Sequence, residues 1–303
     1  MLTRKYGEWL EVSVPSSWEG KTIEDVLKNH WVVPKQMLHQ LRMEKGTKLN
    51  GEFSPWNTPL KVNDRFQIHL FREEEFGVLP EFVPDLHILY EDDHLLIANK
   101  PSGMDTHPNE ENQLGTLSNA IAYYFQANGL FTKVRHIHRL DRDTTGAVIF
   151  AKHKLAAAIL DRKLEKREIK RTYIALVHGI IKQKKGTIDA AIGRDRHHPT
   201  RRRVSPNGQK AVTKFNVLRT FPNKSLSLVE LELLTGRTHQ IRVHLSHLGY
   251  PLVGDTLYGG KPVAPRQALH AARIQLFHPF TNERISCEAP LIDPPPVLRD
   301  LNV

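Results

Sequence analysis

A charged stretch followed at once by an apolar run constrains the fold of this chain more than any other feature. Residues 138–146 read His-Arg-Leu-Asp-Arg-Asp-Thr-Thr-Gly, and Ala-Val-Ile-Phe-Ala follows at 147–151. A short apolar run bounded by a Thr-Gly turn signal predicts a buried strand. Asp141, flanked by Arg139 and Arg142, would then lie in the turn that enters this strand, where a fold can hold an ionised group against a bound polyanion.

The rest of the chain predicts an α+β fold, because strands and helices are mixed rather than strictly alternating. Helices are predicted at residues 117–126, at 155–169, and after the capping residue Thr238 up to Gly249. Further strands are predicted at residues 94–99, 172–177, 211–218 and 226–234, the last with a register break at Leu228 and Val229.

A charged segment broken by Gly and Pro at residues 72–80 predicts a linker. Upstream of it, apolar residues at helical spacing near positions 23–27 and 37–41, with one strand at 65–70, predict a small αα plus β module. We therefore expect a module at 1–72, a linker at 73–84 and a larger domain at 85–303. Three consecutive prolines at 294–296 predict a short terminal bend.

The charge balance favours a polyanionic partner. The 303-residue chain carries 43 Lys and Arg against 33 Asp and Glu, a formal net charge of +10. Such an excess favours nucleic acid over a small neutral metabolite, because basic side chains neutralise phosphates. The basic residues also cluster, since five arginines fall within ten positions: Arg194, Arg196, Arg201, Arg202 and Arg203.

The sequence also bears on the compartment. Cys287 is the single cysteine, which excludes a disulfide within the chain and indicates a reducing environment. The first residues lack the apolar core of a secretory signal, and no apolar run approaches the roughly 18 residues that a membrane span needs. We expect a cytoplasmic protein with no membrane association.

Four ordered segments together resemble the RluA-type RNA pseudouridine synthases. Besides residues 138–146 they are Asn-Lys-Pro-Ser-Gly-Met at 99–104, Tyr-Ile-Ala-Leu-Val-His-Gly at 173–179, and Thr-Gly-Arg-Thr-His-Gln-Ile-Arg-Val-His-Leu at 235–245, running on to Gly-Asp-Thr-Leu-Tyr-Gly at 254–259. Thr145 stands where the family more usually has Ser, and it keeps the hydroxyl. Residues 10–71 resemble an S4-type RNA-binding module less closely, with Thr-Ile-Glu at 22–24 in place of the usual Arg-Leu-Asp.

The resemblance implies an isomerase that converts uridine in structured ribosomal or transfer RNA to pseudouridine, on a mixed, mostly antiparallel sheet flanked by helices. The reaction breaks the bond from ribose C1′ to base N1, rotates the uracil, and joins C5 to C1′. It consumes no electron, phosphate or group donor, so we expect no cofactor and no metal. RNA is the expected partner, and nothing in the sequence demands more than a monomer.

The resemblance also assigns three catalytic residues. Asp141 supplies the essential carboxylate, as nucleophile or as base toward the sugar. Arg242 is expected to pair with Asp141 and to orient it through a guanidinium fork. Tyr173 is expected to stack on the extruded uracil and is a candidate for proton transfer.

Further residues are expected to contact the substrate. Arg139 lies two positions before Asp141, so both side chains would point to the same side of an extended segment. Arg139 could then occupy the gap that a flipped nucleotide leaves in the stack. The other expected contacts are Lys100 and Ile241, as pocket walls, and Arg142 and Thr144, within the motif.

Two competing enzyme classes fit the sequence poorly. The first class is a zinc hydrolase, which the 17 histidines suggest, but no His-x-Glu-x-x-His spacing occurs. His239 and His244 are five positions apart, so on a helix they do not share a face. The second class is nucleotide-dependent phosphotransfer. Gly-Lys-Thr at residues 20–22 resembles the end of a phosphate-binding loop, but Pro15 stands where the first glycine of that loop must be.

The serious alternative is a non-catalytic RNA-binding or ribosome-assembly factor that keeps the fold for its groove. Binding alone does not need Asp141, Tyr173 and Arg242 together, so the presence of all three argues for the enzyme.

Overall fold

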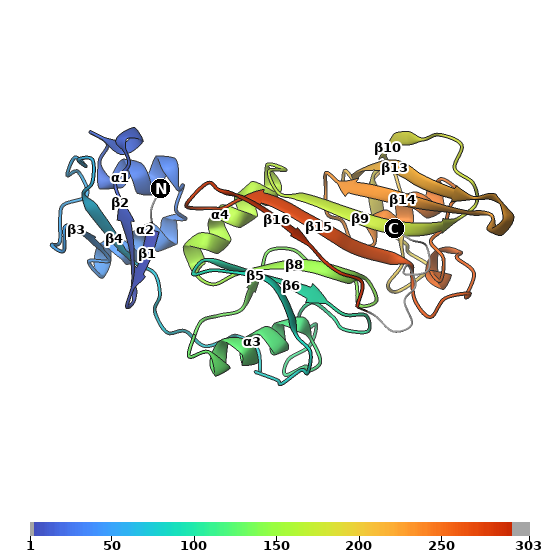
Figure 1. The fold of residues 1–303 in the computed structure, drawn as a ribbon, viewed down its shortest axis with the longest axis horizontal. Helices are drawn as coiled ribbons and strands as arrows, with labels where there is room; N and C mark the ends of the chain where they lie inside the picture. Colours follow the sequence, from blue (N-terminus) through green and yellow to red (C-terminus); the bar gives the residue numbers. More distant parts are fainter. Residues whose placement is uncertain (1–2, 293–303) are drawn as a thin grey trace.

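The computed structural model describes residues 3–292, which form a small N-terminal module and a large mixed sheet with helices against it (Figure 1). The bend predicted at 294–296 lies outside these residues. Within the described part, the strands form a four-stranded sheet, a ten-stranded sheet and a two-stranded hairpin. None of the helices in residues 3–292 is long and apolar enough to cross a membrane.

The N-terminal module is built on an antiparallel sheet of order β1-β2-β4-β3. The sequence predicted one strand here, and that prediction was incomplete. The chain from Trp9 to Ser13 alternates buried Leu10 and Val12 with half-buried neighbours, which is the pattern of a strand covered on one face. The elements are β1 (Thr3–Tyr6), β2 (Trp9–Ser13), α1 (Ile23–Asp25) with a π-helical turn (Val26–His30), α2 (Lys35–Met43), β3 (Thr47–Leu49) and β4 (Arg65–His69).

The large sheet has the order β10-β13-β14-β9-β15-β8-β6-β5, with β16 paired to β15 and β7 to β8. All of its pairings are antiparallel except β8 with β15. This confirms the mixed, mostly antiparallel α+β prediction. The strands are β5 (His87–Glu91), β6 (Leu95–Lys100), β7 (Arg135–His136), β8 (Thr145–Ala151), β9 (Lys170–His178), β10 (Lys185–Asp189), β13 (Val212–Phe221), β14 (Leu226–Leu233), β15 (Leu269–Phe277) and β16 (Arg284–Glu288).

Three helices accompany this sheet: α3 (Leu117–Ala127), α4 (Lys154–Glu165) and α5 (Gln240–His247). A hairpin of β11 (Ile192–Arg194) and β12 (Arg202–Val204) stands apart from the sheet. Helix α3 begins where predicted, because Thr116 and Asn119 form a reciprocal capping box.

Three local predictions were wrong in detail. Helix α4 ends at Glu165 and not at Ile169, because Arg167 adopts a left-handed conformation (φ 64°) that stops the helix before β9. The cap of α5 is His239 and not Thr238. The register break near Leu228 and Val229 belongs to the facing strand, where β13 bulges between Val217 and Arg219.

Gly146 fixes the strand that carries the charged motif. Its φ is +115°, and a Cβ added there would lie 2.3 Å from the carbonyl oxygen of Ala271. Only glycine allows β8 to approach β15 this closely at their parallel pairing. The turn of residues 138–145 is therefore placed against the centre of the sheet.

The N-terminal module lies against the end of α4 and the turn between β15 and β16 (Figure 1). The guanidinium of Arg162 donates a hydrogen bond to the carbonyl of Val32 (2.9 Å), and the rings of Trp31 and Phe280 meet edge to face at 5.7 Å. The intervening segment is anchored as well, since Glu74 makes ion pairs with Arg135 and Lys154. The predicted domain boundaries stay a prediction.

Candidate active site

The turn that carries Asp141 is held by buried polar groups from the neighbouring segment. The hydroxyl of Thr106 donates to the carbonyl of Leu140 and accepts from its amide, both at 3.0 Å. The ammonium of Lys100 donates to the carbonyl of Arg142 at 2.7 Å, and to the carbonyls of Pro101 and Met104. These bonds fix the backbone on both sides of Asp141.

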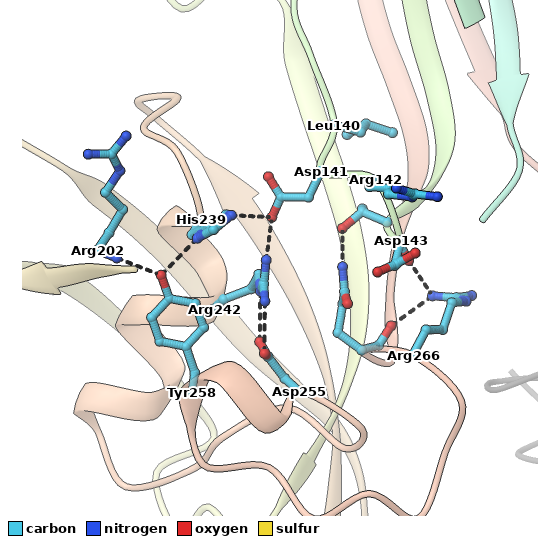
Figure 2. Close-up of polar contacts among 12 residues, drawn as sticks. Leu140, Asp141, Arg142, Asp143, Arg202, His239, Arg242, Asp255, Tyr258 and Arg266 are labelled. Carbon is cyan, nitrogen blue, oxygen red and sulfur yellow. Dashed lines mark hydrogen bonds and ion pairs between the residues drawn. The ribbon is translucent and has the colours of Figure 1, made fainter. Parts of the chain in front are cut away.

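Asp141 pairs with Arg242, which is itself locked by a second carboxylate (Figure 2). Nη1 of Arg242 lies 3.2 Å from Oδ2 of Asp141, while Nε and Nη2 donate to the two oxygens of Asp255 at 2.8 and 2.9 Å. Burial opposes the charge on Arg242, but the hydrogen bonds to Asp255 and the charge of Asp141 together raise its pKa above the ordinary value. Arg242 is therefore a fixed cation beside Asp141.

Asp255, the second carboxylate that contacts Arg242, is buried and fixed in position by the turn that carries it. Its side chain is 1% exposed, against 22% for Asp141, so only Asp141 of the two carboxylates faces the solvent side. The preceding Gly254 has a φ of +77°, and a Cβ there would lie 2.0 Å from the carbonyl oxygen of Arg266. This close approach turns Asp255 toward α5.

Asp141, Arg139 and Tyr173 line one cavity of about 620 Å³. Tyr173 lies on β9 and is 3% exposed, and among residues 3–292 its hydroxyl has no hydrogen-bond partner. Burial raises its pKa, and the charge of Asp141 acts in the same direction. The wall also carries several basic side chains, which with Arg139 outnumber its carboxylates Asp141, Asp161 and Glu165; they are Arg167, Arg171, Lys210 and Arg237. A cavity of this size and charge is suited to a nucleotide.

A larger cavity of about 990 Å³ lies elsewhere, along the segment that follows the N-terminal module. Its wall carries Glu73, Glu75, Glu110 and Glu111. Carboxylates at these positions would repel a phosphate backbone, so this larger space is a poor site for a polyanion.

The other predicted substrate contacts are not on the wall of this cavity: three of them are buried and Arg142 is exposed outside it. Lys100 is fully buried under the motif, where burial lowers its pKa to about 7 while its three carbonyl acceptors require all three ammonium protons. Ile241 is 4% exposed and belongs to the core cluster that contains Tyr173. Arg142 donates to the carbonyl of Gly103, and Thr144 is buried against Gln267.

Sequence reasoning missed three residues of this site: Asp255, His239 and Tyr258. Nε2 of His239 lies 3.9 Å from Oδ2 of Asp141, and its Nδ1 lies 2.8 Å from the hydroxyl of Tyr258. Asp255 and Tyr258 stand in the Gly-Asp-Thr-Leu-Tyr-Gly segment at 254–259, which was singled out without a role for either. This segment is the sequence signal from which Asp255 and Tyr258 could have been identified.

Histidines that suggested the zinc alternative make contacts within the protein. His244 bonds the hydroxyl of Thr213 and the carbonyl of Ala190, both at 2.9 Å, and the rings of His107 and His136 stack at 4.4 Å. Across residues 3–292, no three His, Cys, Asp or Glu side chains form a group that could hold a metal ion. The described residues thus offer no ligand set for the zinc alternative.

Comparisons with known proteins agree with this geometry. Residues 94–247 match the family model described as RNA pseudouridylate synthase, and residues 10–66 match that of the RluD ribosomal pseudouridine synthase N-terminal domain. The chain is 53% identical over 285 residues to the uncharacterized RNA pseudouridine synthase YhcT of Bacillus subtilis, covering 94% of each chain. It is 40% identical over 246 residues to ribosomal large subunit pseudouridine synthase D of Haemophilus ducreyi, covering 75% of this chain and 74% of the other.

A solved structure shares the fold. Human RNA pseudouridylate synthase domain containing 1 superposes with a TM-score of 0.57 at 31% identity, covering 71% of this chain and 86% of that one. These findings favour the enzyme over a non-catalytic RNA-binding factor on the same fold. The chain belongs to the RluA-type RNA pseudouridine synthases, enzymes that isomerise uridine in RNA to pseudouridine.

Proposed function

We propose that this chain isomerises a uridine of large-subunit ribosomal RNA, with Asp141 as the essential carboxylate. The observation that carries the role of Asp141 is its place on the cavity wall, 3.2 Å from an arginine that Asp255 holds still. The choice of RNA follows the relatives named ribosomal large subunit pseudouridine synthase D. Transfer RNA is the competing substrate.

The residues divide the chemistry between them. Asp141 acts on the sugar, as nucleophile at C1′ or as base, while the N1–C1′ bond breaks and the C5–C1′ bond forms. The hydrogen on C5 leaves as a proton and N1 gains one, so atoms and electrons balance without a co-reactant. Tyr173, whose ring lies in the cavity wall and whose hydroxyl has no hydrogen-bond partner among residues 3–292, stacks on the uracil while the base turns and is a candidate for proton transfer.

The target nucleotide must leave its stack to reach the cavity, which costs a few kcal/mol. Arg139 is exposed on the cavity wall, so its guanidinium can occupy the vacated place in the stack. A second cavity of about 330 Å³ shares Arg237 and Thr238 with the first and is lined by Arg194 and Arg202. It offers positive charge to the phosphates that flank the flipped nucleotide.

Lys100, Arg142, Thr144 and Ile241 support the substrate indirectly in this proposal. Lys100 and Arg142 tie the motif to residues 101–104, and Ile241 backs Tyr173 from the core. We further propose that the enzyme works in the cytoplasm, as a monomer and without a cofactor or metal.

The test is turnover on unmodified large-subunit ribosomal RNA and on transfer RNA, with and without a chelator. Pseudouridine is mapped by carbodiimide-dependent stops of reverse transcription. We expect the wild type to modify ribosomal RNA, and Asp141→Asn to form no product while binding RNA within a few fold of wild type, because phosphates carry affinity.

Asp143→Asn is the matched control, since it removes a carboxylate of the same turn that does not line the cavity. Product formation by Asp141→Asn at a rate comparable to wild type would refute the role of Asp141. Modification of transfer RNA alone would refute the choice of ribosomal RNA.

A further inference from the structure

A chain of polar contacts, two of them hydrogen bonds, leads from the arginine-rich hairpin to the catalytic carboxylate (Figure 2). The amide of Arg202 on β12 donates to the hydroxyl of Tyr258 at 2.9 Å. That hydroxyl lies 2.8 Å from Nδ1 of His239, whose Nε2 faces Oδ2 of Asp141 at 3.9 Å. The path thus links β12, a turn of 3₁₀ helix (Thr256–Tyr258), the cap of α5 and the catalytic turn.

The path has a defined direction. Burial lowers the pKa of His239, which favours the neutral ring, and in a neutral ring one nitrogen accepts while the other donates. The Tyr258 oxygen already accepts from Arg202, and within residues 3–292 its proton has no acceptor other than Nδ1 of His239. The hydrogen of His239 therefore lies on Nε2, aimed at Asp141.

The last contact is about 1 Å too long for a hydrogen bond. His239 is surrounded by Asp141, Arg242, Asp255 and Arg202 as charged groups, and by Tyr258 as its ring partner. A small movement of the hairpin toward the catalytic turn would close the gap and give Asp141 a second fixed donor beside Arg242.

The hairpin carries basic side chains that can bind the phosphates of an RNA backbone. Arg201 is held by Asp195 at 2.8 Å, whereas the side chains of Arg202 and Arg203 form no salt bridge in the described part of the chain, although the charge of Arg203 helps to lower the pKa of Asp195. The hairpin also packs on the machinery behind it, because Val204 packs against the apolar cluster that contains Val243 and Tyr258. A displacement of the hairpin when its arginines bind phosphates would therefore also displace Tyr258.

We propose that Tyr258 and His239 are positioning residues, which transmit RNA contact at the β11–β12 hairpin to Asp141 and complete its orientation only when RNA is engaged there. The inference rests on the proposed function of Asp141. It gives the hairpin a part in rate as well as in affinity, since orientation of a catalytic group changes rate steeply.

Two substitutions remove the contacts between Tyr258, His239 and Asp141 but keep the surrounding packing. Tyr258→Phe loses the hydroxyl but keeps the ring that lies 5.0 Å from the guanidinium carbon of Arg242. His239 has a φ of 58°, a conformation that Asn tolerates well, so His239→Asn keeps the cap of α5 but is too short to span from Tyr258 to Asp141. Tyr124→Phe is the control, because it removes a tyrosine hydroxyl bond, to Glu91, far from the site.

The experiment compares two RNAs with the same target loop, one with flanking stem long enough to reach the hairpin and one without it. Single-turnover rates at saturating enzyme and dissociation constants are measured separately, and thermal melting confirms that each variant is folded. We expect the wild type and Tyr124→Phe to react at least tenfold faster on the long RNA. We expect Tyr258→Phe and His239→Asn to lose this advantage while binding the long RNA within twofold of wild type.

Replacing Arg202 and Arg203 together by Ala should weaken binding of the long RNA and also remove its rate advantage. Wild-type rates for Tyr258→Phe and His239→Asn on the long RNA would overturn the coupling, and so would an equal loss on both RNAs. If the wild type forms no pseudouridine on either RNA, the proposed function fails first and the coupling with it.

Discussion

Asp255→Asn is the substitution that tests the site most directly, since Asp255 contacts Arg242 but not the cavity. The replacement keeps the size of the side chain and removes its charge. Asp255 now accepts bonds from Nε and Nη2 of Arg242 at 2.8 and 2.9 Å. An Asn can accept only one of them, and its amide would turn a donor toward the other.

The expected loss follows from burial. Arg242 is 8% exposed and Asp255 is 2% exposed, so solvent cannot replace the missing partner. Removing one member of a buried ion pair costs about 3–5 kcal/mol of unfolding free energy, and Asn should fall near the lower end because it keeps one bond. A displaced Arg242 would also misorient Asp141, and a displacement of about 1 Å lowers the rate about 100-fold.

The two effects are measured separately, by urea unfolding and by single-turnover pseudouridine formation on folded protein. Asp161→Asn is the matched control: Asp161 lines the same cavity and has no ion pair within the described residues, and burial raises its pKa. Asp161→Asn should change neither the free energy of unfolding nor the single-turnover rate by much. If Asp255→Asn kept its stability within 1 kcal/mol and its rate within twofold of wild type, the argument that Asp255 fixes Arg242 would be wrong.

Three further predictions concern the surroundings of the site. Lys100→Met leaves three part-buried carbonyls without their buried donor, so we expect a loss of about 3 kcal/mol in urea unfolding; a loss below 1 kcal/mol would contradict this. Burial lowers the pKa of His94 from 6.5 to about 4, so the unfolded chain binds more protons between these values, and about 3 kcal/mol of stability should be lost as pH falls from 6.5 to 4. His94→Gln should flatten that part of the stability curve, and an unchanged curve would exclude His94 as its cause. RNA affinity should fall steeply between low and moderate salt, as counterion release requires, and a flat response in a filter-binding titration would count against phosphate contacts.

Local pattern predicted the central elements well. The apolar run after the motif is β8, and the helix predicted to begin at residue 117 is α3. Such signals succeed because a short window contains both the periodicity and the turn residues that decide the element. Helix ends were predicted less well, since the left-handed conformations at Arg167 and His239 are imposed by the strand and the turn that adjoin them.

The catalytic set was available from sequence only as separate motifs. Asp141 and Arg242 were paired in advance through the family resemblance, and the structure places them 3.2 Å apart. Lys100 was expected at the pocket wall, yet it lies under the motif with all its protons bonded to backbone. Spacing along the chain cannot tell a residue that faces a cavity from one that supports it from behind.

The sequence by itself determined the positions of several central strands, the turn that presents Asp141, and the excess of positive charge that suits RNA. Only the tertiary structure decided which partner each buried charge takes: Asp255 for Arg242, Tyr258 for His239, and three carbonyls for Lys100. The physical reason is that turns and periodicity act over a few residues. The pairing of buried charges depends instead on which distant segments exclude water from one another when they pack.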